Sequence, residues 1–297
     1  MRFLLAFLLL LSGWAGAAQA SDSGARPLRV FVSVLPQKTF VERLGGERVQ
    51  VEVMVRPGDS PHTYEPTPRQ VAALADADLY VAVGGTFEDA WMGRIRSANP
   101  HMAIVNTGEG LDLRAMQAHD HDRDEEVAPE GGRHQSKDPH LWTSPPLVGQ
   151  MAARIRDALI ALDPAQGLFY AANYASFTSE LEDLDRDIRA QLAGLSDRRF
   201  MVFHPSWGYF ADTYGLIQVP IEHEGKEPGP KALVALIEQA RREEVKVIFV
   251  QPQFSRKAAA QVAAAIDGRV EVMDPLAPDY SANLRRVAAV LAGAGSR

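Results

Sequence analysis

The chain of 297 residues contains no cysteine, so it can form no disulfide and offers no thiolate to a metal. With no cysteine to carry a lipid, we also expect no lipid anchor. No run of roughly 20 apolar residues follows the first part of the chain, which argues against a membrane-spanning helix. The formal charge of −7 gives no basic excess and argues against a nucleic-acid partner. Histidine and carboxylate are the strong metal ligands that this composition leaves.

The first 20 residues have the pattern of a signal peptide. Arg2 gives a positive start, Phe3 to Leu11 form an unbroken apolar run, and Ala18-Gln19-Ala20 fits a cleavage site of small residues. The apolar run is too short to span a membrane as a mature helix. We therefore expect cleavage before Ser21 and a soluble, non-lipidated protein in the periplasm.

Strand-like and helix-like segments alternate in two parts of the chain, which predicts an α/β fold with parallel or mixed sheets covered by helices. The length fits roughly two domains. The expected strands of the first part are Leu28–Val32, Val49–Val55, Leu79–Val83 and Ala103–Asn106, with a helix over Thr67–Ala77. The expected strands of the second part are Phe200–Phe203, Leu216–Ile221, Val245–Val250 and Val270–Val272, with helices over Ala232–Arg242 and Lys257–Ile266.

A single long helix is predicted between the two parts, from Asp163 to Gly194. Its apolar residues recur every three or four positions, which is the spacing of one helix face. They are Tyr174, Phe177, Leu181, Leu184, Ile188 and Leu192. Asp163-Pro164 is typical of a helix start and Gly194 of a helix end. About 30 residues at 1.5 Å each give roughly 45 Å of helix. Both an ordinary core helix and a connector between the two parts fit this pattern.

Three of the eight histidines lie in short, well-separated motifs, each beside a proline. These motifs are Pro61-His62-Thr63-Tyr64-Glu65-Pro66, Asp138-Pro139-His140-Leu141-Trp142 and Phe203-His204-Pro205-Ser206. His62 and His204 each follow an expected strand, and open α/β sheets bind ligands at the carboxyl ends of their strands. Three neutral imidazoles suit a first-row divalent ion, above all zinc. Because His62 and His204 belong to different parts of the chain, a shared site would lie between those parts.

The fourth position of a tetrahedral ion is open to several interpretations. Water in that position is typical of a catalytic zinc site, whereas a protein ligand closes the site. Asp279 follows the last expected strand and is our candidate for a closing carboxylate. Glu65 and Asp274 compete with it. Glu65 could instead accept a hydrogen bond from the other ring nitrogen of His62, and Asp274 could cap the local turn.

The segment from 118 to 134 is rich in histidine and acid and has almost no apolar content, which predicts a surface loop. Its histidines are His119, His121 and His134. Tracts of this composition often bind metal weakly, so the loop is a candidate auxiliary metal site. A solvated loop whose histidines bind nothing is the alternative.

Several motifs together resemble those of one family, the metal-binding solute-binding proteins of ABC transporters in the zinc/manganese cluster. The resemblance covers nearly the whole chain after the signal segment. The matching motifs begin with the three that contain the histidines, the first of them extended to the segment from Pro57 to Pro68 and the third to Phe210. The others are Glu227-Pro228-Gly229-Pro230-Lys231 and Val250-Gln251-Pro252-Gln253-Phe254.

This resemblance implies a fold of two α/β lobes joined by one long rigid helix, with the metal held in the cleft between the lobes. We accordingly expect a signal peptide over 1–20 and an N-terminal lobe over 27–162. A linker helix over 163–194 and a C-terminal lobe over 195–297 would follow.

The resemblance also implies a ligand set and a function. The matched positions His62, His140 and His204 are ligands in the family, with a C-terminal carboxylate, best matched by Asp279, as the fourth. Histidine rather than glutamate at 204 resembles the zinc branch. We therefore expect a monomeric, non-enzymatic protein that captures Zn²⁺ in the periplasm and delivers it to an ABC permease in the inner membrane. A periplasmic metal chaperone is a further conceivable partner.

Four alternatives remain. A manganese- or iron-binding member of the same family would have the same fold. A zinc hydrolase would use three histidines and water, but the sequence has neither an H-E-x-x-H helix nor a serine elbow. An adhesin-like surface protein fits poorly with the lack of a lipid-anchor cysteine. A protein for an organic solute would line its cleft with aromatic and hydrogen-bonding groups rather than with converging imidazoles.

Overall fold

The computed structural model of the chain describes residues 26–116, 137–222, 229–254 and 256–295. It contains two four-stranded parallel sheets, ordered β2-β1-β3-β4 and β6-β5-β7-β8. The strands of the first sheet are β1 Leu28–Val32, β2 Val49–Val53, β3 Leu79–Ala82 and β4 Ala103–Asn106. Those of the second sheet are β5 Arg199–Val202, β6 Ile217–Pro220, β7 Val247–Val250 and β8 Arg269–Val272.

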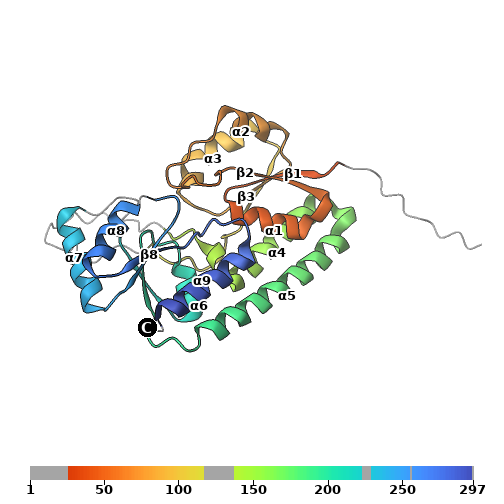
Figure 1. Cartoon of the computed structure of the whole chain (residues 1–297). Coiled ribbons are helices and arrows are strands. Elements are labelled where there is room, and N and C mark those ends of the chain that lie inside the picture. Colours follow the sequence, from red (N-terminus) through yellow and green to blue (C-terminus); the bar gives the residue numbers. More distant parts are fainter. Residues whose placement is uncertain (1–25, 117–136, 223–228, 255, 296–297) are drawn as a thin grey trace, which may run out of the picture.

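Helices cover and connect the two sheets (Figure 1). In the first half they are α1 Leu35–Gly45, α2 Pro68–Ala73, α3 Thr86–Ala98 and α4 Pro145–Leu162. In the second half they are α5 Gly167–Leu192, α6 Gly208–Tyr214, α7 Pro230–Arg242, α8 Arg256–Ala265 and α9 Tyr280–Gly295. Short 3-10 turns lie at η1 Gly46–Arg48, η2 Leu74–Asp76, η4 Leu141–Thr143 and η5 Pro164–Gln166. Of the helices in the described residues, none has the length and apolarity to cross a bilayer.

The prediction of two α/β lobes is confirmed. All eight expected strands are present, with ends that differ by at most two residues from those expected. The central strands β3 and β7 are buried along their whole length, because parallel sheets are covered on both faces and their strands are continuously apolar. The expected helix over Thr67–Ala77 is α2 followed by η2. Helices α1, α3 and α6 were not predicted.

The predicted long helix is α5, which has 26 residues and is preceded by the turn η5. Asp163 stands at the N-cap position of this turn and Pro164 is its first residue, as predicted. The carboxylate of Asp163 makes no capping hydrogen bond and instead accepts hydrogen bonds from Arg48 and Tyr170. Along the helix, the expected apolar face is buried from Phe177 to Leu192.

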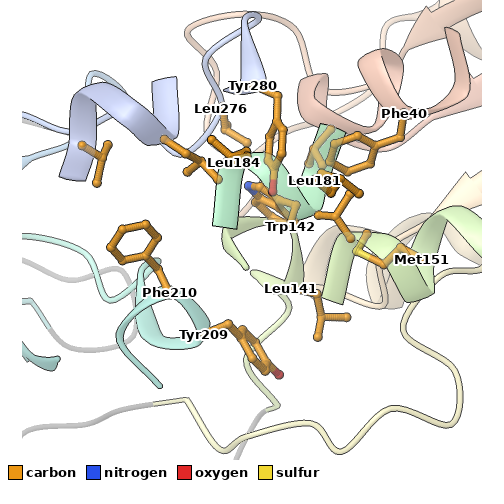
Figure 2. Packing of buried hydrophobic residues seen from close by; sticks show 14 of the residues in the cluster. Phe40, Leu141, Trp142, Met151, Leu181, Leu184, Tyr209, Phe210, Leu276 and Tyr280 are labelled. Atoms are coloured by element: carbon orange, nitrogen blue, oxygen red, sulfur yellow. The ribbon is translucent and has the colours of Figure 1, made fainter. Parts of the chain in front are cut away.

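One apolar core joins both lobes through α5. It includes residues of β1, α1 and α4 on one side and of β5, α6 and α9 on the other. Figure 2 shows the meeting point, where Tyr280 of α9 lies against Phe40 of α1. Their ring centroids are 5.0 Å apart in an edge-on arrangement. Wide separation of the lobes would expose this shared core to water, so the fold resists hinge opening.

Candidate metal centre

The structure brings the three predicted histidines together between the lobes. His62 lies in the loop after β2, His140 precedes η4, and His204 follows β5. One ring nitrogen of each lies within 4.8 Å of the other two. The Nε2 atoms of His62 and His204 are 3.0 Å apart, and the ring centroid of His140 is 5.2 Å from that of His204. The carboxyl-end rule therefore placed His62 and His204 correctly, whereas His140 comes from the segment before η4.

This spacing is close to that of a tetrahedral zinc site. Imidazole nitrogens about 2.0–2.1 Å from a tetrahedral ion are roughly 3.3 Å from each other. The 3.0 Å separation between His62 and His204 needs to widen by only a few tenths of an ångström to admit the ion.

A buried carboxylate lies behind each of two histidines. Asp138 Oδ1 is 2.7 Å from Nδ1 of His140, and Glu222 Oε1 is 2.6 Å from Nδ1 of His204. Both carboxylates are almost completely buried. Each accepts the Nδ1 proton of a neutral imidazole, which directs the Nε2 lone pair of that ring toward the centre. Their two negative charges also match the charge of a divalent ion.

Gln251, directly after β7, holds the backbone of His204 in place. Its Oε1 accepts a hydrogen bond from the N–H of His204 at 3.1 Å, and its Nε2 donates to the carbonyl of His204 at 2.6 Å and to Ser206 Oγ at 3.0 Å. Phe254 stacks on the imidazole of His204, with centroids 4.8 Å apart. Gln251 thus holds the backbone of His204, Phe254 contacts the face of its ring, and Glu222 accepts the proton of its Nδ1.

The electrostatics of the site favour neutral imidazoles. Burial, followed by repulsion from the nearby rings of His204 and His140, lowers the pKa of His62 to about 3. Burial also lowers the pKa of His204, although its hydrogen bond to Glu222 opposes part of that effect. Neutral imidazole is the form that binds a metal ion.

Asp279 does not join the three histidines in this structure. Its side chain is exposed, and its Oδ1 accepts a hydrogen bond from the N–H of Ala282 at 3.1 Å. It therefore caps the first turn of α9, which satisfies a backbone donor that has no partner within the helix. Of the acidic and histidine residues described, His62, His140 and His204 are the group that could hold an ion.

The other two carboxylates considered in the sequence also have different positions. Glu65 is exposed, and it makes no hydrogen bond with His62 among the described residues. Asp274 accepts hydrogen bonds from Gln253 Nε2 and from the N–H of Leu276, so it caps the local turn as one alternative expected. The predicted auxiliary histidines His119, His121 and His134 lie outside the described residues.

Three functional residues were missed from the sequence. Asp138 was part of a recognised motif, and the Asp-x-His spacing could have identified it. Glu222 is the second residue after β6, and Gln251 is the first residue after β7. The same carboxyl-end rule that found His204 could therefore have found both. Nothing in the sequence itself indicates that a ring nitrogen of His204 lies against Glu222.

Comparisons with known proteins agree with this geometry. The family described as "Zinc-uptake complex component A periplasmic" matches residues 30–294. The chain is 28% identical to the high-affinity zinc uptake system protein ZnuA of Bacillus subtilis over 92% of this chain and 87% of that protein. It is 26% identical to the zinc-binding protein AdcA of Streptococcus pyogenes serotype M3, over 84% of this chain but only 50% of AdcA.

Solved structures show the same fold. A crystal structure of ZnuA is 40% identical to the chain, with a TM-score of 0.84 over 91% of this chain and all of that one. A laminin-binding protein of Streptococcus agalactiae, described as bifunctional with adhesin and metal-transporting activity, is 25% identical, with a TM-score of 0.78 over 91% of this chain and 99% of that one.

Proposed function

We propose, because the chain belongs to the periplasmic zinc-uptake complex component A family, that it binds Zn²⁺ in the periplasm and delivers the ion to an ABC importer. The observation that carries this proposal is the convergence of three imidazoles, two of them backed by buried carboxylates. Zinc is the cargo of the protein, and the chain is not an enzyme.

The proposed ligands are Nε2 of His62, His140 and His204. Since Asp279 caps α9 and does not join this group, we propose water as the fourth ligand. Three nitrogen ligands favour zinc over manganese, which prefers oxygen. A manganese-binding member of the family is therefore the second candidate, and its site would be expected to contain more carboxylate ligands.

A hydrolase is disfavoured by the position of the carboxylates. In many zinc hydrolases a general base beside the zinc-bound water assists its attack on the substrate. Asp138 and Glu222 both lie on the Nδ1 side of their imidazoles, where they accept ring protons and face away from the position of the ion. The site thus holds an ion firmly without offering a base to its water.

The proposal extends to partners and location. We infer a monomer without a lipid anchor that docks on a permease of the inner membrane, with delivery by a metal chaperone as a possible earlier step. The proposed boundaries are those of the sequence analysis: signal peptide 1–20, lobes 27–162 and 195–297, and connector 163–194. Adhesion, named for the streptococcal relative, has no supporting feature among the described residues.

Release of zinc should come from local movement. The shared core resists separation of the lobes, whereas His62 lies in a loop nine residues beyond the end of β2 and is only half-buried. Movement of this loop would remove one of three protein ligands and weaken the site. We propose that docking on the permease favours that movement.

Zinc-dependent growth tests the function. A bacterium that lacks its own zinc-binding protein is grown with a zinc chelator and supplied with the wild-type chain or with His204→Ala. We expect rescue by the wild-type chain alone, and zinc accumulation in the rescued cells. Equal rescue by both chains, or rescue that depends on added manganese, would contradict the proposal.

A further inference from the structure

Arg114 lies behind the metal centre, on the chain between β4 and α4. Its Nε atom is 3.8 Å from Oδ2 of Asp138, the carboxylate whose other oxygen contacts His140. Among the lysine and arginine side chains that the structure describes, Arg114 is the one within ion-pair distance of Asp138. A buried carboxylate without a cation nearby is costly, so the guanidinium of Arg114 offsets part of the cost of burying Asp138 at this place.

The backbone of Arg114 is fixed at the same place. Its carbonyl accepts a hydrogen bond from the N–H of Asp138 at 2.9 Å, and its N–H donates to Tyr209 Oη at 3.1 Å. Tyr209 Oη in turn donates to the carbonyl of Asp138 at 2.8 Å. Burial, followed by the negative charge of Asp138, raises the pKa of Tyr209 to about 12, so this hydroxyl keeps its proton at neutral pH.

These contacts connect the two lobes. Tyr209 belongs to α6 of the second lobe, and the guanidinium of Arg114 also lies 3.4 Å from Asp212 of the same helix. A Cβ atom on Gly208, the first residue of α6, would fall on the Nη1 atom of Arg114. The guanidinium therefore occupies the space that this glycine leaves open. Helix α6 begins four residues after His204. The same helix therefore lies next to His204 in the chain and contacts Asp138, the residue that holds His140.

We propose that Arg114 is a positioning residue, which holds Asp138 against α6 and thereby fixes the metal-facing nitrogen of His140 relative to His204. The proposal rests on the proposed function of the three histidines as zinc ligands. Asp138 directs the Nε2 of His140 only while its carboxylate lies against Nδ1 of that ring. Arg114 and Tyr209 supply the charge and the placement from the two lobes.

The test uses the full chain with four substitutions. Arg114→Gln removes the charge at similar length, and Arg114→Lys keeps the charge without the planar fork. Gly208→Ala displaces the guanidinium and leaves every charge in place. Asp212→Asn removes the exposed partner of Arg114, which should contribute little because exposed ion pairs are weak.

A matched control is available at the other end of α4. Arg48 pairs with Asp163 at 3.1 Å, and its side chain is 15% exposed, compared with 17% for Arg114. Asp163 follows the last residue of α4, whose 18 residues span about 27 Å. Arg48→Gln therefore removes a similar ion pair at a distance from the histidines.

Three quantities are measured: zinc affinity by competition with a chelator, the ¹⁵N shifts of the His140 ring, and thermal stability. We expect Arg114→Gln and Gly208→Ala to raise the zinc dissociation constant about tenfold, in the range found for partners behind metal ligands. The His140 shifts should change from one tautomer to a mixture. Arg114→Lys should keep more of the zinc affinity than Arg114→Gln does. Asp212→Asn and Arg48→Gln should leave the zinc affinity and the His140 shifts unchanged.

The proposal is overturned if Arg114→Gln leaves affinity and the His140 tautomer within error of the wild type, or if Arg48→Gln changes them equally. A wild-type chain that does not bind zinc would contradict the proposed function instead. In that case the His140 tautomer in the metal-free protein still decides whether Arg114 positions this ring.

Discussion

The first sheet, ordered β2-β1-β3-β4, and the second, ordered β6-β5-β7-β8, share one parallel topology but present their histidines differently. His204 stands two residues beyond the end of β5, is buried, and is fixed by Glu222 and Gln251. His62 stands nine residues beyond the end of β2 in a half-buried loop. A ligand next to a strand end is held rigidly, whereas a ligand on a longer loop can move.

This difference suggests how one site can both hold and release an ion. The second lobe supplies a fixed ligand, and the loop of the first lobe supplies one that can withdraw. His140 is intermediate, because its own chain segment is irregular but Asp138 and α6 hold it in place. Tight binding therefore needs all three rings, and release needs movement of only one.

The largest expected effects come from removing one histidine from each lobe. Both His204→Ala and His62→Ala should weaken zinc binding about a hundredfold or more, since a zinc site of about 10–16 kcal/mol shared among four ligands gives roughly 2.5–4 kcal/mol for each. Chelator competition measures this loss. In the metal-free protein we expect the two variants to differ in stability. Only His204→Ala leaves the buried Glu222 without its imidazole partner.

Chemical denaturation of the two metal-free variants separates these roles. We expect His204→Ala to lower the free energy of unfolding by about 1–3 kcal/mol, the usual cost of an unsatisfied buried polar group. His62→Ala should change it by less than about 1 kcal/mol, because this side chain is only half-buried. Equal losses in both variants would show that the two histidines are held alike.

A smaller effect concerns acid. The folded state keeps His62 neutral down to a pKa of about 3, whereas the unfolded chain takes up this proton near pH 6.5. Keeping His62 neutral therefore costs the folded state no stability above about pH 6.5. Below that pH the unfolded chain binds the extra proton, so the free energy of unfolding falls as the pH falls toward 3. The loss is at most about 1.4 kcal/mol per pH unit for each such histidine.

Denaturation of the metal-free wild type at pH 7, 6 and 5 measures this dependence. His62→Ala should show a shallower loss of stability across the same range. The comparison fails if the two proteins lose stability in parallel, because the loop histidine would then be as well solvated in the folded state as in the unfolded one.

The smallest expected effect is that of Asp279→Ala. This carboxylate caps α9, so its removal should cost about 1 kcal/mol of stability and leave the zinc dissociation constant within about twofold. Thermal unfolding and chelator competition on the same sample measure both quantities. A large loss of affinity would restore Asp279 as a ligand and would require the start of α9 to move toward the histidines.

The sequence predicted the parts of this molecule that depend on local pattern. Buried runs such as Val247–Val250 can only be central strands in a covered sheet, and the stripe from Phe177 to Leu192 can only be one helix face. The placement of His62 and His204 followed from the carboxyl ends of parallel strands in the two lobes, whereas His140 was expected from its motif. These features are set by periodicity and topology.

The supports of the site could not be predicted in this way. Whether Asp279 binds an ion or caps a helix depends on the direction of a turn, and both roles suit the same residue at the same position. The contact of Glu222 with Nδ1 of His204 depends on how β6 and β5 align in space. Arg114 was not singled out, because nothing near it in the sequence reveals that α6 lies beside it.

Metal content after competition tests the central claim most directly. The wild-type chain is stripped of metal, equilibrated with equimolar Zn²⁺ and Mn²⁺, separated from free ions and assayed for both elements. The account predicts one zinc and no manganese per chain. Retention of manganese, or of neither ion, would contradict a zinc site built from His62, His140 and His204.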